Sequence, residues 1–298
     1  MSVTAKAAEG LHKLFAISIG DPMKVMLLDN ARRVCAPLAT RMLSQIGLDN
    51  ESATPFKLFD NACGPGVVAS ELQSLIRPEV LQKSSILCGD FSEQLVGLAK
   101  ERIVGEGWVN TEARQIDAQN TGLPSGEFTH VTANIGFHVI PDSESALDES
   151  IRILQPGGIL GFTTWHRPAG WAPVVQKAFE SFPFEAPFAA NLVQTTPWGD
   201  WADVNWVRKT LENKGLEEVK VDIFAFLSRV DSPEHFMAST GLMIDWVMQA
   251  SWSDELRKEH GRDEVHRMVQ EFVEKKYEGR GWDQIGIAVI ASGRVPRL

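Results

Sequence analysis

A glycine-rich turn between an apolar strand and a helix constrains the fold of this chain more than any other feature. The apolar run of residues 56–61 is typical of a strand and carries an acid at Asp60. Gly64 and Gly66 follow, and residues 67–75 have a helical pattern. Glycine lets a ligand approach the backbone, and helix N-terminal N–H groups are free donors. The stretch predicts a nucleotide-binding turn, although its G-x-G-x-x-A spacing also fits dinucleotide-binding folds.

Strand-like and helical patterns alternate after this turn, which predicts a mostly parallel sheet with helices on both faces. Two late strand-like runs, residues 219–228 and 285–292, flank a helical excursion over residues 233–277. We expect these two strands to form an antiparallel pair at the sheet edge, so the fold class is a doubly wound α/β sheet. The other strand-like runs are residues 85–89, 112–116, 128–135 and 159–165, with helical patterns at 93–105 and 143–154.

The chain divides into a short N-terminal segment and one large domain. Residues 1–50 have helical periodicity that Gly47 ends as a C-cap, and they could either pack on the domain or form a lid over a ligand site. Residues 51–298 form the sheet-containing domain. We expect helical cap insertions in it at about residues 166–215 and 231–283.

Composition excludes several classes of partner. The formal net charge of −10 and the lack of clustered Lys and Arg argue against nucleic acid as the main partner. No apolar run approaches the roughly 20 residues that span a bilayer. Cys35, Cys63 and Cys88 have neither metal-ligand nor disulfide-framework spacing, and the histidines are scattered, so we expect no metal site and a cytoplasmic protein.

Polar side chains stand at the ends of four strand-like runs: Asp60, Asp90, Asp117 and Asn134. The carboxyl ends of parallel strands meet at one edge of a sheet, so these side chains should converge there. Asp90 can accept hydrogen bonds from both hydroxyls of a ribose, and Asp117 can accept one from an exocyclic amine. Asp60 and the loop amides can hold an amino-acid head group. Ribose, adenine and amino acid together make up S-adenosylmethionine.

The same features weigh against a nicotinamide dinucleotide. No basic residue or second glycine-rich turn is available for phosphates, and an acid stands near the strand ends. The expected cofactor is therefore S-adenosylmethionine, with S-adenosylhomocysteine as product and no metal. The residues expected to bind it are Asp60, Ala62, Gly64, Gly66, Asp90, Phe91, Asp117, Ala118, Asn134 and Ile135.

Several motifs resemble those of class I S-adenosylmethionine-dependent methyltransferases. They are Asp60-Asn-Ala-Cys-Gly-Pro-Gly66, Gly89-Asp-Phe-Ser92, Asp117-Ala118 and Leu154-Gln-Pro-Gly-Gly158. The resemblance implies a Rossmann-like, seven-stranded sheet. More narrowly, Glu106-Gly-Trp-Val-Asn110 and Thr121-Gly-Leu-Pro124 resemble fungal secondary-metabolite methyltransferases near the gliotoxin bis-thiomethyltransferase. The resemblance covers residues 56–165 and fades in the cap regions, which would select the substrate.

The expected reaction is an in-line displacement at the methyl group, in which the protein mainly aligns the reactants and excludes water. His138 and His166 follow the fourth and fifth strand-like runs and are the candidate general bases. Phe137, Trp165 and Trp171 could form an aromatic wall for a flat acceptor.

The acceptor is expected to be a small, largely apolar secondary metabolite. His138 favours an oxygen nucleophile, from a hydroxyl or carboxyl group, over the alternative of a thiol. A non-catalytic regulator that binds S-adenosylmethionine is a further alternative, and the protein could be a monomer or a homodimer.

Overall fold

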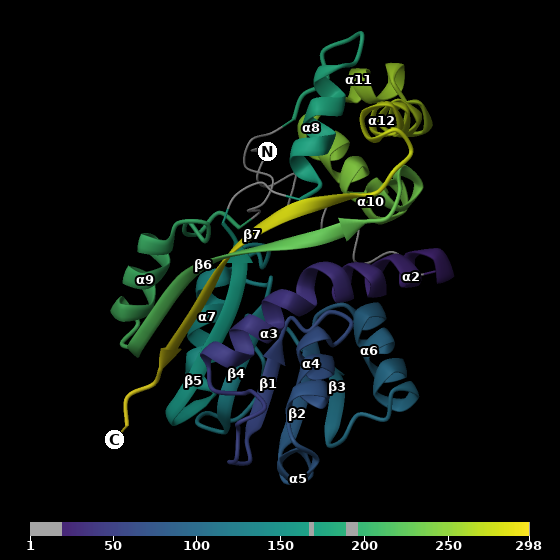
Figure 1. The fold of residues 1–298 in the computed structure, drawn as a ribbon. Coiled ribbons are helices and arrows are strands. Elements are labelled where there is room, and N and C mark those ends of the chain that lie inside the picture. The colour runs from purple at the N-terminus through teal and green to yellow at the C-terminus, as the bar shows by residue number, and fades with distance from the viewer. Residues whose placement is uncertain (1–19, 167–169, 189–195, 298) are drawn as a thin grey trace.

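The computed structural model describes residues 20–166, 170–188 and 196–297 (Figure 1). The part of the predicted N-terminal helical segment that covers residues 1–19 lies outside these described ranges. Within them, no helix is long and apolar enough to cross a membrane.

The described residues form one seven-stranded sheet, in the order β3-β2-β1-β4-β5-β7-β6. Strands β1 to β5 are parallel, whereas β7 pairs antiparallel with both β5 and β6. The doubly wound fold class and the antiparallel pair at the edge are therefore confirmed. The strands are β1 (Lys57–Asn61), β2 (Ser85–Asp90), β3 (Thr111–Gln115), β4 (Phe128–Asn134), β5 (Leu154–Trp165), β6 (Glu217–Val230) and β7 (Trp282–Arg294).

Apolar helices cover both faces of the sheet. On one face, α3 (Ala36–Gln45), α4 (Val67–Leu75) and α6 (Glu93–Gly105) share a buried cluster with β1 and β2. On the other face, α7 (Ser143–Arg152) and α9 (Val204–Asn213) share a second cluster with β4 and β5. A parallel strand buried on both faces needs this two-sided cover, which explains the continuous apolar runs in the sequence. The short helix α5 (Pro78–Leu81) precedes β2.

A long N-terminal helix lies across the sheet and reaches towards the cap (Figure 1). It consists of α2 (Asp21–Asn30), a π-helical turn η1 (Ala31–Cys35), and α3. Its sheet-facing part is held by close packing, since a Cβ at Gly161 of β5 would lie 2.7 Å from Ile46 Cγ2. The helix ends at Gln45, and the left-handed Gly47 (φ 81°) follows, close to the predicted C-cap.

The cap is a separate apolar cluster above the sheet (Figure 1), built from α8 (Ala172–Glu180), α10 (Pro233–Ser251) and α12 (Arg262–Tyr277), with α11 (Asp254–Glu259) beside them. The first cap insertion differs from the prediction in one respect. Helix α9 falls within residues 166–215 but packs on the sheet, because Val207 and Leu211 on one of its faces are fully buried against it.

Candidate active site

The turn after β1 has the open backbone that its glycines predict. Gly64 has φ 54°, and a Cβ added there would meet nothing within 4 Å, so the turn leaves space beside it. Gly66 has a different reason to be glycine. Its φ is 78° at the N-terminus of α4, and a Cβ would lie 2.9 Å from the Trp108 ring. Gly64 therefore leaves open space beside the turn, whereas a side chain at Gly66 would collide with Trp108.

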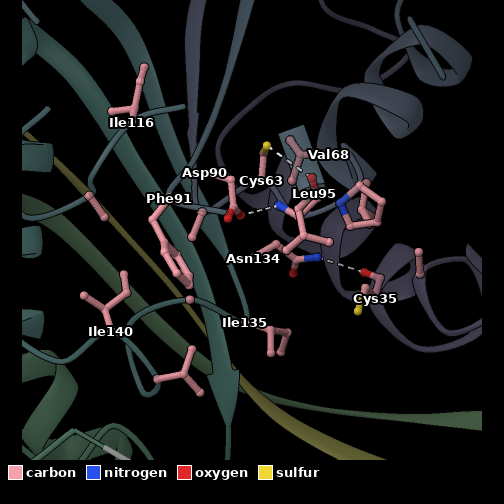
Figure 2. Close-up of a pocket in the computed structure, with 18 of the residues that line it drawn as sticks. Cys35, Cys63, Val68, Asp90, Phe91, Leu95, Ile116, Asn134, Ile135 and Ile140 are labelled. Atoms are coloured by element: carbon pink, nitrogen blue, oxygen red, sulfur yellow. Dashed lines mark hydrogen bonds between the residues drawn. The ribbon is translucent and has the colours of Figure 1, made fainter. Parts of the chain in front are cut away.

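Asp90 joins this turn to the end of β2. The Gly64 N–H donates to its Oδ2 at 2.8 Å (Figure 2), and the Ser92 N–H donates to its Oδ1 at 3.0 Å. The side chain is 5% exposed, and burial raises the pKa of Asp90 although these two bonds oppose the shift. A carboxylate held in this way keeps further lone pairs for hydroxyl donors from a ligand.

A pocket of about 380 Å³ opens beside this carboxylate. Its first wall comes from the ends of β1, β2 and β3, and we call it the strand-end wall: residues 62–65, Asp90, Phe91 and residues 116–119. Its second wall, the helical wall, consists of Leu27, Asn30, Ala31 and Cys35 from the N-terminal helix. The lining is completed by Asn134 at the end of β4, residues 135, 136 and 139–141 after it, Val67 and Val68 of α4, and Leu95 of α6.

Two lining residues have a strained backbone at the ends of their strands. Ala62 has φ 63° and Ile135 has φ 60°, although left-handed conformations are unusual for residues with a Cβ and most of all for β-branched ones. The structure holds Ile135 in place, because its N–H donates to both the carbonyl and the hydroxyl of Thr163. Such strain is concentrated at ligand sites, where the surrounding structure enforces it.

Asp60 lies behind the strand-end wall and does not line the pocket. Its side chain is 1% exposed, and Oδ1 accepts a hydrogen bond of 2.9 Å from the Thr132 hydroxyl. Oδ2 is buried and has no hydrogen-bond partner among the described residues. Burial raises the pKa of Asp60 to about 8, and the nearby charge of Asp90 adds to this shift. An unpaired buried oxygen of this kind suits a cationic ligand group.

The remaining predicted cofactor residues divide into two groups. Phe91, Asp117 and Ala118 line the mouth of the strand-end wall, where the Phe91 ring is 40% exposed and the Asp117 carboxylate accepts from the Gln119 side chain at 2.9 Å. Asn134 also lines the pocket, but its amide is already engaged. It donates to the Cys35 carbonyl at 3.1 Å (Figure 2) and accepts from the Thr163 hydroxyl at 2.6 Å.

The fold does not bring the predicted bases to the pocket. His138 is 3% exposed, and burial lowers its pKa to about 3. Its Nδ1 has no partner among the described residues, and the lining passes from Gly136 to Val139 without it. His166 does not line the pocket either, and its Nδ1 lies 2.7 Å from the Ala202 carbonyl oxygen.

The predicted aromatic wall is also placed elsewhere. Phe137 is fully buried and stacks on Trp201, with ring centroids 4.9 Å apart. Trp165 stacks on Phe226 of β6, and Trp171 packs into the cap cluster. None of the three rings lines the pocket.

The sequence left open whether the N-terminal helical segment packs on the domain or forms a lid over a ligand site, and it did not single out the residues of the helical wall. Leu27, Ala31 and Cys35 are spaced by four residues, which places them on one face of a helix, and that periodicity was visible. The pattern could not show what this face packs against. Val139, Ile140 and Pro141 were missed as well, because no motif marks the residues after β4.

These residues fit S-adenosylmethionine. The strand-end wall offers a carboxylate at Asp90, an exposed ring at Phe91, and a glycine turn with free space. Asp60 adds an unpaired buried oxygen behind the turn. The order of the strands and the position of this pocket at their carboxyl ends define the class of protein, a class I methyltransferase.

Comparison with known proteins agrees with this class. The family described as Methyltransferase domain matches residues 59–162. Methyltransferase tpcH from Aspergillus fumigatus is 31% identical over 87% of this chain and 91% of its own length. The acetylaranotin bis-thiomethyltransferase from Aspergillus terreus is 28% identical over 89% of this chain and 92% of its own. The chain therefore belongs to the S-adenosylmethionine-dependent methyltransferases, and its relatives include fungal methyltransferases.

A solved structure shows the same fold. Phosphoethanolamine N-methyltransferase 2 from Haemonchus contortus, in complex with S-adenosylmethionine, superposes with a TM-score of 0.50 at 15% sequence identity. The match covers 87% of this chain and 52% of that one. At this identity the likeness concerns the fold alone.

Proposed function

We propose that this enzyme transfers the methyl group of S-adenosylmethionine to a small, largely apolar metabolite. The two-walled pocket carries the proposal, because its walls differ in chemistry. Asp90 and the glycine turn give the strand-end wall its hydrogen-bonding groups. Leu27 and Ala31 of the helical wall, with Ile140 opposite, offer an apolar surface for the acceptor. The fungal relatives support secondary metabolism as the setting.

The bound cofactor would supply a methyl group on a positively charged sulfur. Asp90 would hold the ribose, Asp60 would compensate the ammonium group, and Phe91 would pack against the adenine. The remaining work of the chain is to align the acceptor and to exclude water, which the apolar helical wall is suited to do.

The acceptor nucleophile is proposed to ionise without help from the protein. No histidine lines the pocket in the described part of the chain, and burial makes His138 a very weak base. A carboxyl group near pKa ~4 needs no base and a thiol near ~8.5 needs little, whereas a phenol near ~10 benefits from one. A carboxyl oxygen is therefore the preferred oxygen acceptor. A thiol is the second candidate, and similarity to a bis-thiomethyltransferase supports it.

Calorimetric titration with S-adenosylhomocysteine, with NADP in a parallel cell, tests the cofactor assignment. We expect tight binding of the former alone. Failure to bind S-adenosylhomocysteine would contradict the proposal, and binding of NADP would favour hydride transfer.

The acceptor can then be probed with three compounds that share one apolar body: 2-naphthoic acid, 2-naphthalenethiol and 2-naphthol. Each is incubated with the enzyme and methyl-labelled S-adenosylmethionine, and the labelled products are separated by chromatography. We expect the acid or the thiol to be methylated faster than the naphthol. A preference for the naphthol would show that the protein does supply a base.

The cellular setting is part of the same proposal. The three cysteines are free, as expected for a reducing compartment such as the cytoplasm. The acidic charge of the chain supports a small-molecule partner over nucleic acid. Sedimentation equilibrium would distinguish the monomer from the homodimer.

A further inference from the structure

Besides the apolar packing of Ala31 and Cys35 and the ion pair of Lys24 with Glu101 of α6, polar contacts hold the helical wall at both of its ends. At its C-terminal end, the Cys35 carbonyl accepts the bond from Asn134 of β4. At its other end, side chains of α2 and η1 contact the N-terminus of α10 and the end of β6. Asn30 contributes there by donating to the Ser239 carbonyl of α10 at 3.2 Å. The segment between these attachments is the part that lines the pocket.

Four charged or titratable side chains form the second attachment, and we call them the clamp: Asp29, Arg33, Asp231 and His235. Arg33 Nε donates to Asp29 Oδ1 at 2.8 Å, and Arg33 Nη2 donates to Asp231 Oδ2 at 2.6 Å. His235 Nδ1 accepts from the Asp231 N–H at 2.9 Å, so a neutral His235 carries its proton on Nε2. That nitrogen lies 2.8 Å from Asp29 Oδ2 and donates to it.

The clamp is partly shielded from water, which makes it stronger than an ordinary surface ion pair. The side chains of Asp29, Arg33 and His235 are 19%, 26% and 21% exposed, whereas that of Asp231 is 54% exposed. Burial alone would raise the pKa of Asp29, but the hydrogen bonds from Arg33, His235 and Arg32 outweigh it and hold that pKa below its ordinary value. The carboxylate is thus charged and paired at neutral pH.

The clamp and the pocket use different faces of the same helix. Leu27, Ala31 and Cys35 face the pocket, whereas Asp29 and Arg33 lie on a face rotated away from it. Between the two attachments the helix contains the π-helical turn η1. Turns of this type are rare and frequent at functional sites, and they interrupt the regular hydrogen-bond ladder. The helix therefore has a place to bend when one attachment opens.

We propose that the clamp closes the helical wall over the cofactor, and that its opening limits how fast the product S-adenosylhomocysteine leaves. The proposal rests on the proposed function, since it assumes that the pocket holds this cofactor. Asp29, Arg33 and His235 act as positioning residues, because they would reach the ligand only through the helix.

The test compares three variants by surface plasmon resonance, with the full chain immobilised and S-adenosylhomocysteine as the analyte. Asp29→Ala removes the carboxylate that pairs with Arg33 and His235, and Arg33→Gln removes the ion pair with Asp231, which lies between β6 and α10. Both should raise the dissociation rate constant about fivefold or more. Arg32→Gln is the matched control. Arg32 also pairs with Asp29, but within the same helix and 74% exposed, so its loss should leave the rate unchanged.

Salt distinguishes the clamp from a general weakening of the fold. Raising ionic strength screens the clamp, so release from the wild type should accelerate, whereas release from Asp29→Ala should respond less. Equal rates for the wild type, Asp29→Ala and Arg33→Gln would overturn the proposal. So would an equal acceleration by Arg32→Gln. If the wild type bound no S-adenosylhomocysteine at all, the cofactor assignment itself would be wrong, which is a different outcome from equal release rates.

Discussion

The two walls of the pocket are held in different ways. The strand-end wall is fixed by the backbone of a parallel sheet and by Asp90, which binds Gly64 only 26 residues away in sequence. The helical wall is fixed by side chains that join distant segments, such as Asp29 with His235, which are 206 residues apart. We therefore expect the first wall to be the more rigid of the two, and the second to be the one that shifts during acceptor binding and product release.

Substitution of Asp90 is expected to have the largest effect on affinity for S-adenosylhomocysteine. It tests whether the strand-end wall binds the cofactor. Asp90→Ala removes a buried carboxylate that anchors the turn and is proposed to bind the ribose. Hydrogen bonds to charged groups contribute about 1.5–3 kcal/mol each, so the Kd for S-adenosylhomocysteine should rise about 100-fold. Titration calorimetry measures it.

Asp117→Ala is the comparison variant for this experiment. Asp117 lines the same wall but is exposed, so water competes for its hydrogen bonds and the loss of affinity should be several times smaller. Equal effects of the two substitutions would show that burial of Asp90 does not matter. An unchanged Kd for Asp90→Ala would remove the ribose assignment.

A smaller effect on affinity for S-adenosylhomocysteine is expected from Asp60. This residue lies behind the strand-end wall, so it extends the comparison of the two walls to a group that does not line the pocket. With its pKa raised to about 8, Asp60 is mostly protonated at pH 7 in the free protein. A bound ammonium group nearby would favour the carboxylate, so binding should release a proton. Affinity for S-adenosylhomocysteine should then rise with pH between 6 and 8, by at most about tenfold per unit.

Calorimetry in buffers of different ionisation enthalpy reports that proton directly. Asp60→Asn should abolish both the released proton and the pH dependence. Stability should depend on pH in the opposite direction to affinity. The folded state keeps on Asp60 a proton that the unfolded chain loses near pH 4, so the contribution of Asp60 to stability falls as pH rises towards 8. Identical pH profiles for wild type and Asp60→Asn would show that Asp60 does not compensate the ammonium group.

The sequence predicted the sheet and several residues of the strand-end wall, because both depend on local patterns. Alternating strands and helices indicate the order of elements, and Asp60, Asp90 and Asp117 each stand near the carboxyl end of a recognisable strand. The helical wall depends on where α2 lies after folding, which no local pattern encodes. Phe137 and Trp165 show the same limit. The sequence pattern of an aromatic residue at the end of a strand is the same whether the ring lines a pocket or packs in a core.

The smallest effect is expected from His138 and concerns the pH dependence of stability. His138 lies directly before the lining residues Val139 and Ile140, so its substitution tests whether the buried residue next to the lining is outside the pocket. Its pKa of about 3 in the folded protein is below the value of about 6.5 in an unfolded chain, so only the unfolded state takes up a proton between these values. The contribution of His138 to stability is therefore present above pH 6.5 and is lost as pH falls. His138→Gln removes it, so the stability difference between wild type and variant should change by about 0.7 kcal/mol between pH 7 and pH 6. Chemical denaturation at both pH values measures this difference, with His166→Gln as the comparison because His166 is only partly buried. A pH-independent difference for His138→Gln would mean that the pKa of this histidine is the same in the folded and unfolded states, and the argument that it cannot serve as a base at the pocket would no longer hold.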